Sequence, residues 1–344
     1  MPAPKSTYFT NKKIVVQFVL SLLVFFIHFS VFSVFGEDPQ LIQLFGILRM
    51  ATRVAVPLFF VISGALFFRD YTFYATLKKW KSRFFSLCIP YLVWNTLWLL
   101  LALLGYYTPL GNFLGGVKAA FTWENILAGI FLHRFFEPFW FIRQSILLAV
   151  LCPLIYLLLK NRWVGLVAIA AFYAACFLGL HFSTYLFYDT DMILFYLIGA
   201  YIGIHGFQSF TSQKPKWVAG AGLCVYILCC VFHGFSPLLP AWCETWRLPL
   251  LVNALSCFAF WLAFDLFDHE ACPKFTRESF LLYAGHSLVG AAVSKLIRML
   301  LPQGHLFTCL TALVAFPATV VILCICGRLL ERFFPRLKRI LTGK

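Results

Sequence analysis

Two ionisable side chains lie within the first two long apolar segments of this chain. His28 follows a run of aliphatic and aromatic residues, and Arg53 precedes the apolar sequence VAVPLFFVISGALFF. A charge inside a lipid bilayer is costly, so an ionisable residue there indicates a functional site. Histidine can accept a proton near neutral pH, and arginine can stabilise a developing negative charge. The two residues together therefore indicate a functional site within the membrane.

The elements that must position these residues are transmembrane helices. Of the 344 residues, 62% are hydrophobic and 12% are charged, and the mean hydropathy is +0.86, which excludes a soluble globular domain. A spanning helix needs about 20 mostly apolar residues. We therefore predict an all-α polytopic membrane protein with a bundle of about ten transmembrane helices. The predicted segments are 14–35, 45–68, 84–105, 139–159, 163–180, 187–204, 216–233, 248–267, 278–297 and 306–328.

Two of these segments are weaker than the rest. Segment 163–180 is short, and segment 278–297 is interrupted by His286 and Lys295. Residues 110–138 are too polar to span easily, so we expect a loop there with an interfacial or re-entrant piece near 123–133. Between eight and eleven membrane spans therefore remain compatible with the sequence.

The basic residues predict the orientation of the chain. The net charge is +15, and most lysines and arginines fall in alternate links and at the two ends. By the positive-inside rule, both termini lie in the cytoplasm. The charge therefore indicates topology and not a nucleic-acid site. The first apolar stretch is too long for a signal peptide, so we expect a retained multi-pass protein of a bacterial-type cytoplasmic membrane. The 12 cysteines are expected to be packing residues, without a metal site.

The helical rise gives the depth of the polar residues. We counted from the basic residue that marks the inner end of each segment, at 1.5 Å per residue. His28, Arg53 and Arg143 then lie about 22, 24 and 25 Å from the inner edge of a hydrocarbon core about 30 Å thick. All three are therefore predicted in the outer third of the membrane.

Polar residues in the first segment share one helix face. Gln17, Ser21 and His28 are spaced by four and seven residues, so their side chains lie on the same side. Lipid cannot satisfy their hydrogen bonds, and this face is expected to point into the bundle.

The second segment combines cations with a helix breaker. Arg49 and Arg53 are four residues apart, and Pro57 follows after four more. Proline removes the hydrogen bond to the carbonyl four residues earlier, which here belongs to Arg53. We therefore expect a bent helix with an open backbone beside Arg53. The small residues Ser63 and Gly64 are expected to allow close approach of another helix.

Structural explanations compete with a functional one for each residue. Arg49, Lys295 and Arg53 could extend to the lipid headgroups. His28 and His286 could serve only as hydrogen-bonding groups between helices.

The predicted cytoplasmic link RDYTFYATLKKWKSRFF carries a basic cluster. It could rest on anionic lipid, or it could bind a phosphorylated cytosolic ligand. The basic residues that would make this binding patch are Lys78, Lys79, Lys81 and Arg83.

Six segments, taken in order, resemble acyltransferase family 3, the integral-membrane acyltransferases that modify surface glycans. The likeness covers nearly the whole chain, which would be a single domain, 1–344, of the stand-alone form. The segments are FFIHFS (25–30), RVAVPLFFVISGALFF (53–68), KKWKSRFFSLCIPYLVW (78–94), FWFIRQSILLAVLCPLIYLL (139–158), FYLIGAYIG (195–203) and FLLYAGHSLVG (280–290).

Two positions depart from the family pattern. Much of that family has an arginine eleven residues before the first-helix histidine, where this chain has Gln17. The late segment has Ser287 after His286 in place of proline. A role for an arginine in the inner half of the first helix therefore cannot be transferred to this chain.

The resemblance implies transfer of an acyl group from cytosolic acyl-CoA, most often acetyl-CoA, to a hydroxyl of a lipid-linked or surface glycan. His28 would deprotonate the acceptor or briefly carry the acyl group. Arg53 would stabilise the oxyanion, with Arg143 as the second choice. The basic link would hold the CoA phosphates, and an outer-third site suggests an acceptor presented from the outer face. Residues expected to contact substrate are Arg143, Gln17, Arg49 and His286.

Two other classes of function remain open from the residues alone. A polytopic transporter or exporter of a glycan precursor or small anionic solute would also carry charges near mid-membrane and a kinked helix. A sensor or scaffold of a glycan-assembly complex is the third possibility.

Overall fold

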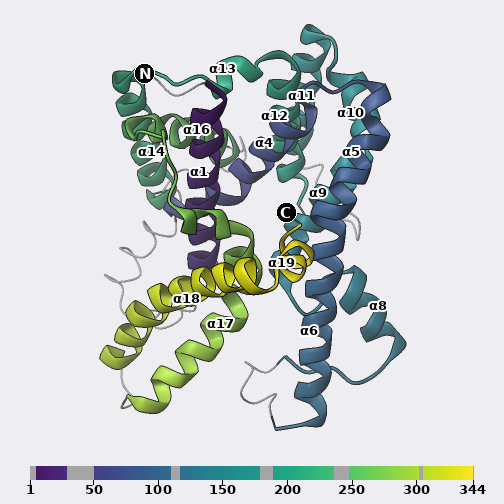
Figure 1. Cartoon of the computed structure of the whole chain (residues 1–344). Coiled ribbons are helices and arrows are strands. Elements are labelled where there is room, and N and C mark those ends of the chain that lie inside the picture. Colours follow the sequence, from purple (N-terminus) through teal and green to yellow (C-terminus); the bar gives the residue numbers. More distant parts are fainter. Residues whose placement is uncertain are drawn as a thin grey trace. The chain divides into compact units, whose positions relative to one another are not determined.

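The computed structural model describes residues 5–28, 50–109, 117–178, 189–235, 248–301 and 305–343. Every regular element in these ranges is a helix (Figure 1). Seven helices within them are long and apolar enough to cross a membrane, an eighth candidate is a pair bent by 66°, and two apolar helices are shorter. The seven are Thr7–His28, Met50–Phe68, Phe73–Tyr107, Lys216–Phe235, Leu248–Leu266, Lys274–Leu300 and Leu313–Phe333.

Each of the ten predicted segments overlaps one of these helices, and the parts at 29–35, 45–49, 179–180 and 187–188 lie outside the described residues. The bent pair is α9 (Trp140–Val150) with α10 (Cys152–Leu159), and the shorter helices are Arg162–Cys176 and Asp191–His205. The predicted interfacial piece is the short helix α8 (Trp123–Phe131). The all-α polytopic membrane fold is therefore confirmed. The number of crossings and the side on which the termini lie stay predictions.

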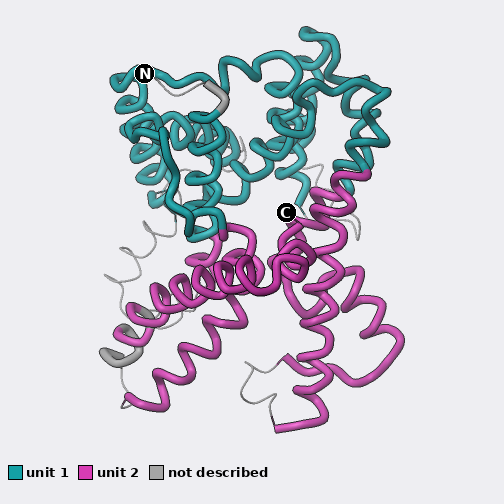
Figure 2. The backbone as a smooth tube through the Cα atoms, in the orientation of Figure 1, with its two compact units in different colours: residues 1–23, 39–80, 147–277 teal, residues 24–38, 81–146, 278–344 magenta. Residues whose placement is uncertain are grey.

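The chain divides into two compact units (Figure 2). Unit 1 comprises residues 1–23, 39–80 and 147–277, and unit 2 comprises residues 24–38, 81–146 and 278–344. Unit 1 contains most of α1 (Lys5–His28), together with α4 (Ala55–Phe68), α10, α11 (Arg162–Phe177), α12 (Asp191–His205), α13 (Phe207–Thr211), α14 (Lys216–Phe235) and α16 (Leu248–Ala263). Unit 2 contains α6 (Ile89–Tyr107), α8, most of α9, α17 (Ser279–Leu300), α18 (His305–Phe333) and α19 (Pro335–Thr342).

In unit 1, α4 packs so closely against α12 that their backbones are in contact at glycine positions. A Cβ atom at Gly203 would lie 2.6 Å from the carbonyl oxygen of Ala65, and one at Gly199 would overlap the Val61 carbonyl. A Cβ atom at Gly64 would lie 2.5 Å from the carbonyl oxygen of an α12 residue. Small residues allow such close packing in membranes. The prediction that Gly64 permits close helix approach is confirmed.

This packing makes the fold sensitive to a single methyl group. We expect Gly199→Ala to destabilise unit 1 by about 1–3 kcal/mol, because the methyl overlaps the backbone of α4. Gly220→Ala in α14 is the matched control, since a Cβ atom there meets nothing within 4 Å. The midpoint of thermal unfolding in detergent measures both. Equal midpoints for the two variants would show that α4 and α12 do not pack this closely.

The second predicted segment is broken at Arg53, as Pro57 required. The residues 53–54 form a turn between helical residues 50–52 and α4, and the Arg53 amide bonds to the Met50 carbonyl at 3.1 Å. The Tyr226 hydroxyl of α14 donates to the carbonyl of Ala51 at 2.7 Å. A side chain thus bonds to a backbone oxygen beside the break, whereas the open carbonyl predicted at Arg53 itself stays a prediction.

The bend between α9 and α10 has the same origin. Pro153 has no N–H to give to the carbonyl of Ala149, four residues earlier. The Trp80 indole N–H donates to that oxygen instead, at 2.9 Å. A proline at the first turn of α10 therefore ends α9 without leaving a buried acceptor unsatisfied.

In unit 2, α17 packs on α18, and α19 packs on α6 (Figure 1). The Trp94 indole N–H donates to the Leu341 carbonyl at 3.0 Å, and Lys338 pairs with the buried carboxylate of Glu278 at 2.7 Å. Burial lowers the pKa of Lys338, but its hydrogen bonds to Glu278 and Glu331 raise it more, so the net pKa lies above the ordinary value. The last helix is thereby fixed to the body of its unit.

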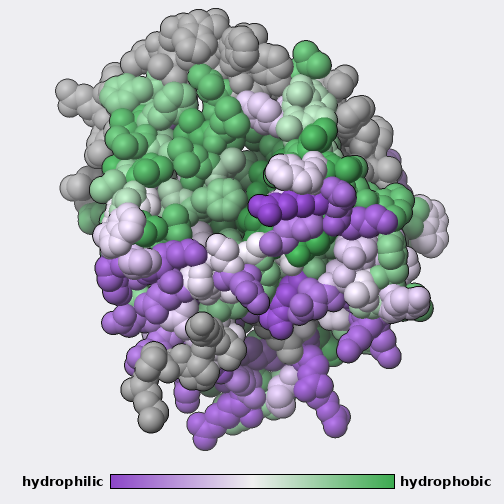
Figure 3. Space-filling view, turned by 90° about the horizontal axis from the view of Figure 1, so that it is seen from above, coloured by the Kyte–Doolittle hydropathy of each residue, from purple (hydrophilic) through white to green (hydrophobic). Residues whose placement is uncertain are grey.

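The surface of the molecule separates apolar from polar side chains. Figure 3 shows one face, on which green apolar side chains and purple hydrophilic side chains gather in different areas. Large apolar residues are exposed on most of the long helices, for example Leu104, Leu228 and Val321. Exposed apolar side chains on this scale indicate contact with lipid.

Candidate active site

His28 and His286 form a stacked pair in unit 2. Their ring centroids are 5.6 Å apart, with 29° between the ring planes. His28 is the last described residue of α1 and is exposed, whereas His286 in α17 is fully buried. The two residues are 258 positions apart in sequence, and the fold brings them into contact.

The tautomer of His286 follows from its hydrogen bond. The ring Nδ1 lies 2.7 Å from the carbonyl oxygen of Tyr283. A carbonyl can only accept, so Nδ1 carries the proton, and in the neutral ring Nε2 presents its lone pair. Nε2 is buried and has no hydrogen-bond partner among the described residues. A buried polar atom without a partner needs an explanation, and a catalytic role is one of those known.

Aromatic side chains surround this pair. Phe25 and Phe136 lie 5.3 and 6.1 Å from His286 between ring centroids. Trp98 stacks on Phe136 at 4.9 Å, with 6° between the planes. These rings keep water away from His286 and lower the local dielectric, which strengthens electrostatic effects at the site.

Three ionisable residues before and within α9, His133, Glu137 and Arg143, interact electrostatically with one another or with His28. The Glu137 carboxylate interacts electrostatically with His28 and with His133, and Arg143 interacts with His133. Burial lowers the pKa of His133 to about 4, with a further contribution from Arg143. His133 is therefore neutral at pH 7. Sequence reasoning missed His133 and Glu137, although the polar run HRFFE directly before the fourth predicted segment was a usable signal.

Arg53 lies in unit 1, where its environment includes His233. Arg53 is exposed in the turn before α4, and it interacts electrostatically with His233 of α14, whose side chain is buried. His233 is 17 residues beyond Lys216, and so about 26 Å along the helix. Sequence reasoning missed His233, which the same count of helical rise would have placed at the depth of Arg53. The pairing of Arg53 with His28 stays a prediction.

The remaining predicted substrate residues have separate positions. Arg143 is half-buried in α9, and Gln17 is half-buried in α1. The Ser21 hydroxyl donates to the Gln17 carbonyl at 2.9 Å, so this buried hydroxyl is satisfied within its own helix. The predicted contact of Arg49 lies outside the described residues.

The basic link has one residue with a structural task. The Lys79 ammonium donates to the carbonyls of Phe67 and Arg69, at 2.6 and 2.9 Å, and so caps the C-terminal end of α4. Its positive charge favours that position, because the last carbonyls of a helix carry partial negative charge. The other three residues of the patch lie along α5 (Thr76–Arg83), with Lys78 and Lys81 exposed. Binding of CoA by this patch stays a prediction.

The side chains of the described residues include no cluster of three or more His, Cys, Asp or Glu that could hold a metal ion. The described groups that could take part in chemistry are histidine bases, guanidinium groups and the nearby Glu137 carboxylate.

Comparison with known proteins identifies the family. The family model described as "Acyltransferase domain" matches residues 14–328, which is nearly the whole chain and includes His28, Arg53, Arg143 and His286. The comparisons with curated proteins and with solved structures gave no match. Among the three classes of function left open above, the family match selects the enzyme. The chain therefore belongs to acyltransferase family 3, the family that its six segments resemble, and is a multi-pass membrane acyltransferase.

Proposed function

We propose that the protein moves an acyl group, and specifically an acetyl group, from cytosolic acyl-CoA to a sugar hydroxyl of a cell-surface or lipid-linked glycan. The observation that carries this proposal is the pairing of an exposed histidine, His28, with a buried one, His286, within a membrane acyltransferase. An exposed imidazole can reach a substrate, and the buried imidazole behind it fixes its place. The enzyme would act in the cytoplasmic membrane.

The reaction needs a base, because a sugar hydroxyl is a poor nucleophile. As the hydroxyl oxygen attacks the thioester carbonyl, His28 takes the hydroxyl proton. The tetrahedral intermediate then collapses, the carbon–sulfur bond breaks, and the CoA sulfur leaves with the proton from the His28 imidazolium. The Glu137 carboxylate favours that imidazolium electrostatically. In the alternative route, His28 first attacks the thioester and carries the acyl group to the acceptor.

The oxyanion of the intermediate needs a cation. Arg53 is our first choice, because the broken helix around it leaves its side chain exposed at the predicted depth of His28. Arg143 is the second choice, since it lies in unit 2 with the histidine pair. Gln17 and Arg49 are proposed to contact the acceptor, and His286 to hold His28 against it.

Arg53→Lys separates an oxyanion role from contact with lipid headgroups. Lysine keeps the charge but lacks the planar fork of donors. We expect transfer to fall by about 10²–10³-fold, as on loss of an oxyanion donor. The control is membrane insertion, which is measured by the accessibility of the termini to protease and should be unchanged. Full activity in Arg53→Lys would show that this side chain only reaches the headgroups.

Transfer itself can be tested directly. We expect purified protein in lipid nanodiscs, incubated with radiolabelled acetyl-CoA and membrane glycan from the host, to move label into the glycan. Alkaline hydrolysis of the product should release the label as acetate, as for an ester. The proposal is wrong if no label is transferred and no CoA binds.

A further inference from the structure

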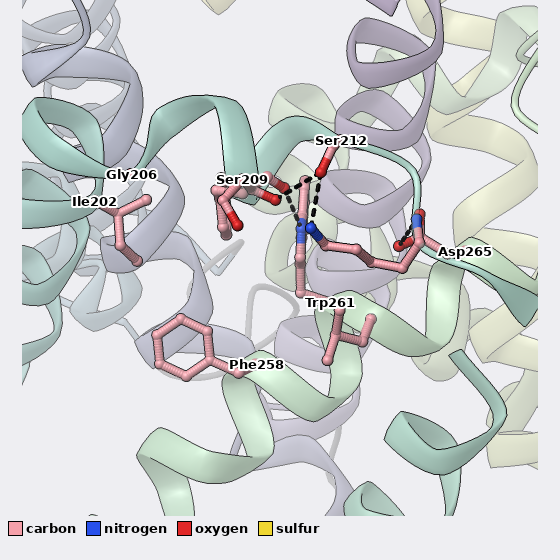
Figure 4. A pocket seen from close by; sticks show the side chains of 10 residues that line it. Ile202, Gly206, Ser209, Ser212, Phe258, Trp261 and Asp265 are labelled. Carbon is pink, nitrogen blue, oxygen red and sulfur yellow. Dashed lines mark hydrogen bonds between the residues drawn. The ribbon is translucent and has the colours of Figure 1, made fainter. Parts of the chain in front are cut away.

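A pocket lies in unit 1, whereas the histidine pair belongs to unit 2. Its volume is about 300 Å³, at the lower end of the range for small-molecule sites. It is lined by the end of α12, by α13 and the link that follows, and by α16 and the short 3₁₀-helix Phe264–Leu266 after it (Figure 4). The residues used below are Ser209, Ser212, Lys214, Phe258, Trp261 and Asp265.

The walls of the pocket are held in place by contacts between distant residues. The Trp261 indole N–H donates to the Phe210 carbonyl at 3.0 Å, and the two rings stack at 4.5 Å. Asp265 is fully buried and pairs with the buried ammonium of Lys12 at 2.7 Å. Its second oxygen accepts the Lys214 backbone N–H at 3.3 Å. A ligand therefore meets a pre-formed site and does not have to order it.

The charge at this end of unit 1 favours an anion. The Lys214 ammonium donates to the Ser212 hydroxyl at 2.8 Å, and in the described part of the chain no carboxylate lies within ion-pair distance of it. The Arg69 guanidinium lies 5.3 Å from the ring of Phe207 on α13, but it is already paired with Asp70 at 3.1 Å. Lys214 is therefore the cation of the pocket lining that an anionic ligand would pair with.

The apolar and hydroxyl groups favour a ligand that also has a planar ring. Phe258 and Ser209 lie on opposite sides of the pocket, from α16 and α13 (Figure 4). The Phe258 ring is half-buried and can contact the face of a base. The Trp261 ring already stacks on Phe210, and the Lys12 ammonium lies 4.4 Å from its centroid, so we assign Trp261 to the wall of the pocket. A lipid chain would leave the Lys214 charge unmatched.

By the predicted orientation, the link 206–215 faces the cytosol. We propose that this pocket binds the nucleotide head of the cytosolic acyl donor, with the base beside Phe258 and a phosphate at Lys214. The inference rests on the proposed use of acyl-CoA. It places the nucleotide in the pocket of unit 1. The basic patch on α5 could then bind other parts of CoA, although Lys79 of that patch is hydrogen-bonded to the end of α4.

Filling the pocket tests the proposal. Ser209→Phe places a ring in the pocket from an exposed position of α13, and Gln208→Phe is the matched control on the neighbouring exposed residue, which does not line the pocket. We expect radiolabelled CoA, measured by equilibrium dialysis in nanodiscs, to bind Gln208→Phe as it binds the unaltered protein. Ser209→Phe should bind at least about tenfold more weakly, and so should Lys214→Met. Adenosine 3′,5′-bisphosphate should compete with CoA for the unaltered protein.

Each outcome of these measurements supports or overturns the assignment of the pocket to the CoA nucleotide. Equal CoA affinity in Ser209→Phe, Lys214→Met and the control would overturn the pocket while leaving the proposed reaction intact. Loss of a co-purified phospholipid from Ser209→Phe, with CoA binding unchanged, would identify a lipid occupant and also overturn it. If the unaltered protein neither binds CoA nor transfers label, the proposed function and the pocket assignment both fail.

Discussion

Replacing His28 by alanine should lower the rate of acyl transfer by about 10²–10⁴-fold, the usual contribution of a general base. The imidazole is the exposed member of the stacked pair, so its loss removes the proton acceptor while the buried His286 remains. His286 cannot replace it, because its Nδ1 proton is held by the Tyr283 carbonyl and its Nε2 is buried. Initial rates with radiolabelled acetyl-CoA measure the effect.

The control for this variant is Ile27→Ala. Ile27 precedes His28 in α1 and is half-exposed, so its truncation tests the effect of a smaller side chain at the same helix end. We expect Ile27→Ala to keep its rate within a few-fold, and both variants to be recovered from membranes in equal amount. A fully active His28→Ala would show that the histidine has no part in proton transfer or in carrying the acyl group.

The largest expected effect on stability comes from Lys12→Met. Lys12 and Asp265 are 1% and 0% exposed and pair at 2.7 Å, and the Tyr8 hydroxyl also donates to Asp265. Removing one partner of a buried ion pair leaves the other charge uncompensated, which costs about 3–5 kcal/mol. We therefore expect a clear fall in the midpoint of thermal unfolding in detergent, followed by tryptophan fluorescence.

Two further variants make this result specific. Lys12→Met combined with Asp265→Asn removes both charges but keeps an acceptor for Tyr8, and it should be more stable than Lys12→Met alone. Lys216→Met removes an exposed pair with Asp268, whose side chains are 54% and 81% exposed, and should cost less than about 1 kcal/mol. If the double variant were no more stable than Lys12→Met, the loss would come from packing of the lysine side chain and not from the unpaired carboxylate.

The positions of the helices were predictable because they depend on local composition. About 20 apolar residues in a row can satisfy their backbone hydrogen bonds in lipid only as a helix. The break at Arg53 was predictable for the same reason, since Pro57 lacks the N–H that would bond to the carbonyl four residues earlier. The order of six short segments was also sufficient to predict the family.

The partners of the polar residues were not predictable in this way. His28 meets His286, and Lys12 meets Asp265, across more than 250 residues of sequence. Helical rise predicts the depth of a residue but not which helix faces it. The count of rise could have found His233, whereas no local pattern marks Asp265 as the partner of Lys12.

The sequence by itself determined that this chain is a bundle of membrane helices, that the second of them is interrupted before Pro57, and that the chain belongs to an acyltransferase family. Hydropathy, the effect of proline on a helix and the order of motifs depend only on residues close in sequence, so they can be predicted from the sequence. The tertiary structure decided that α12 packs against α4 through glycines and that His286 contacts His28 with a fixed tautomer. It also decided that Asp265, which lines a pocket, pairs with Lys12. These features depend on contacts between distant segments, which packing in three dimensions selects and local sequence does not encode.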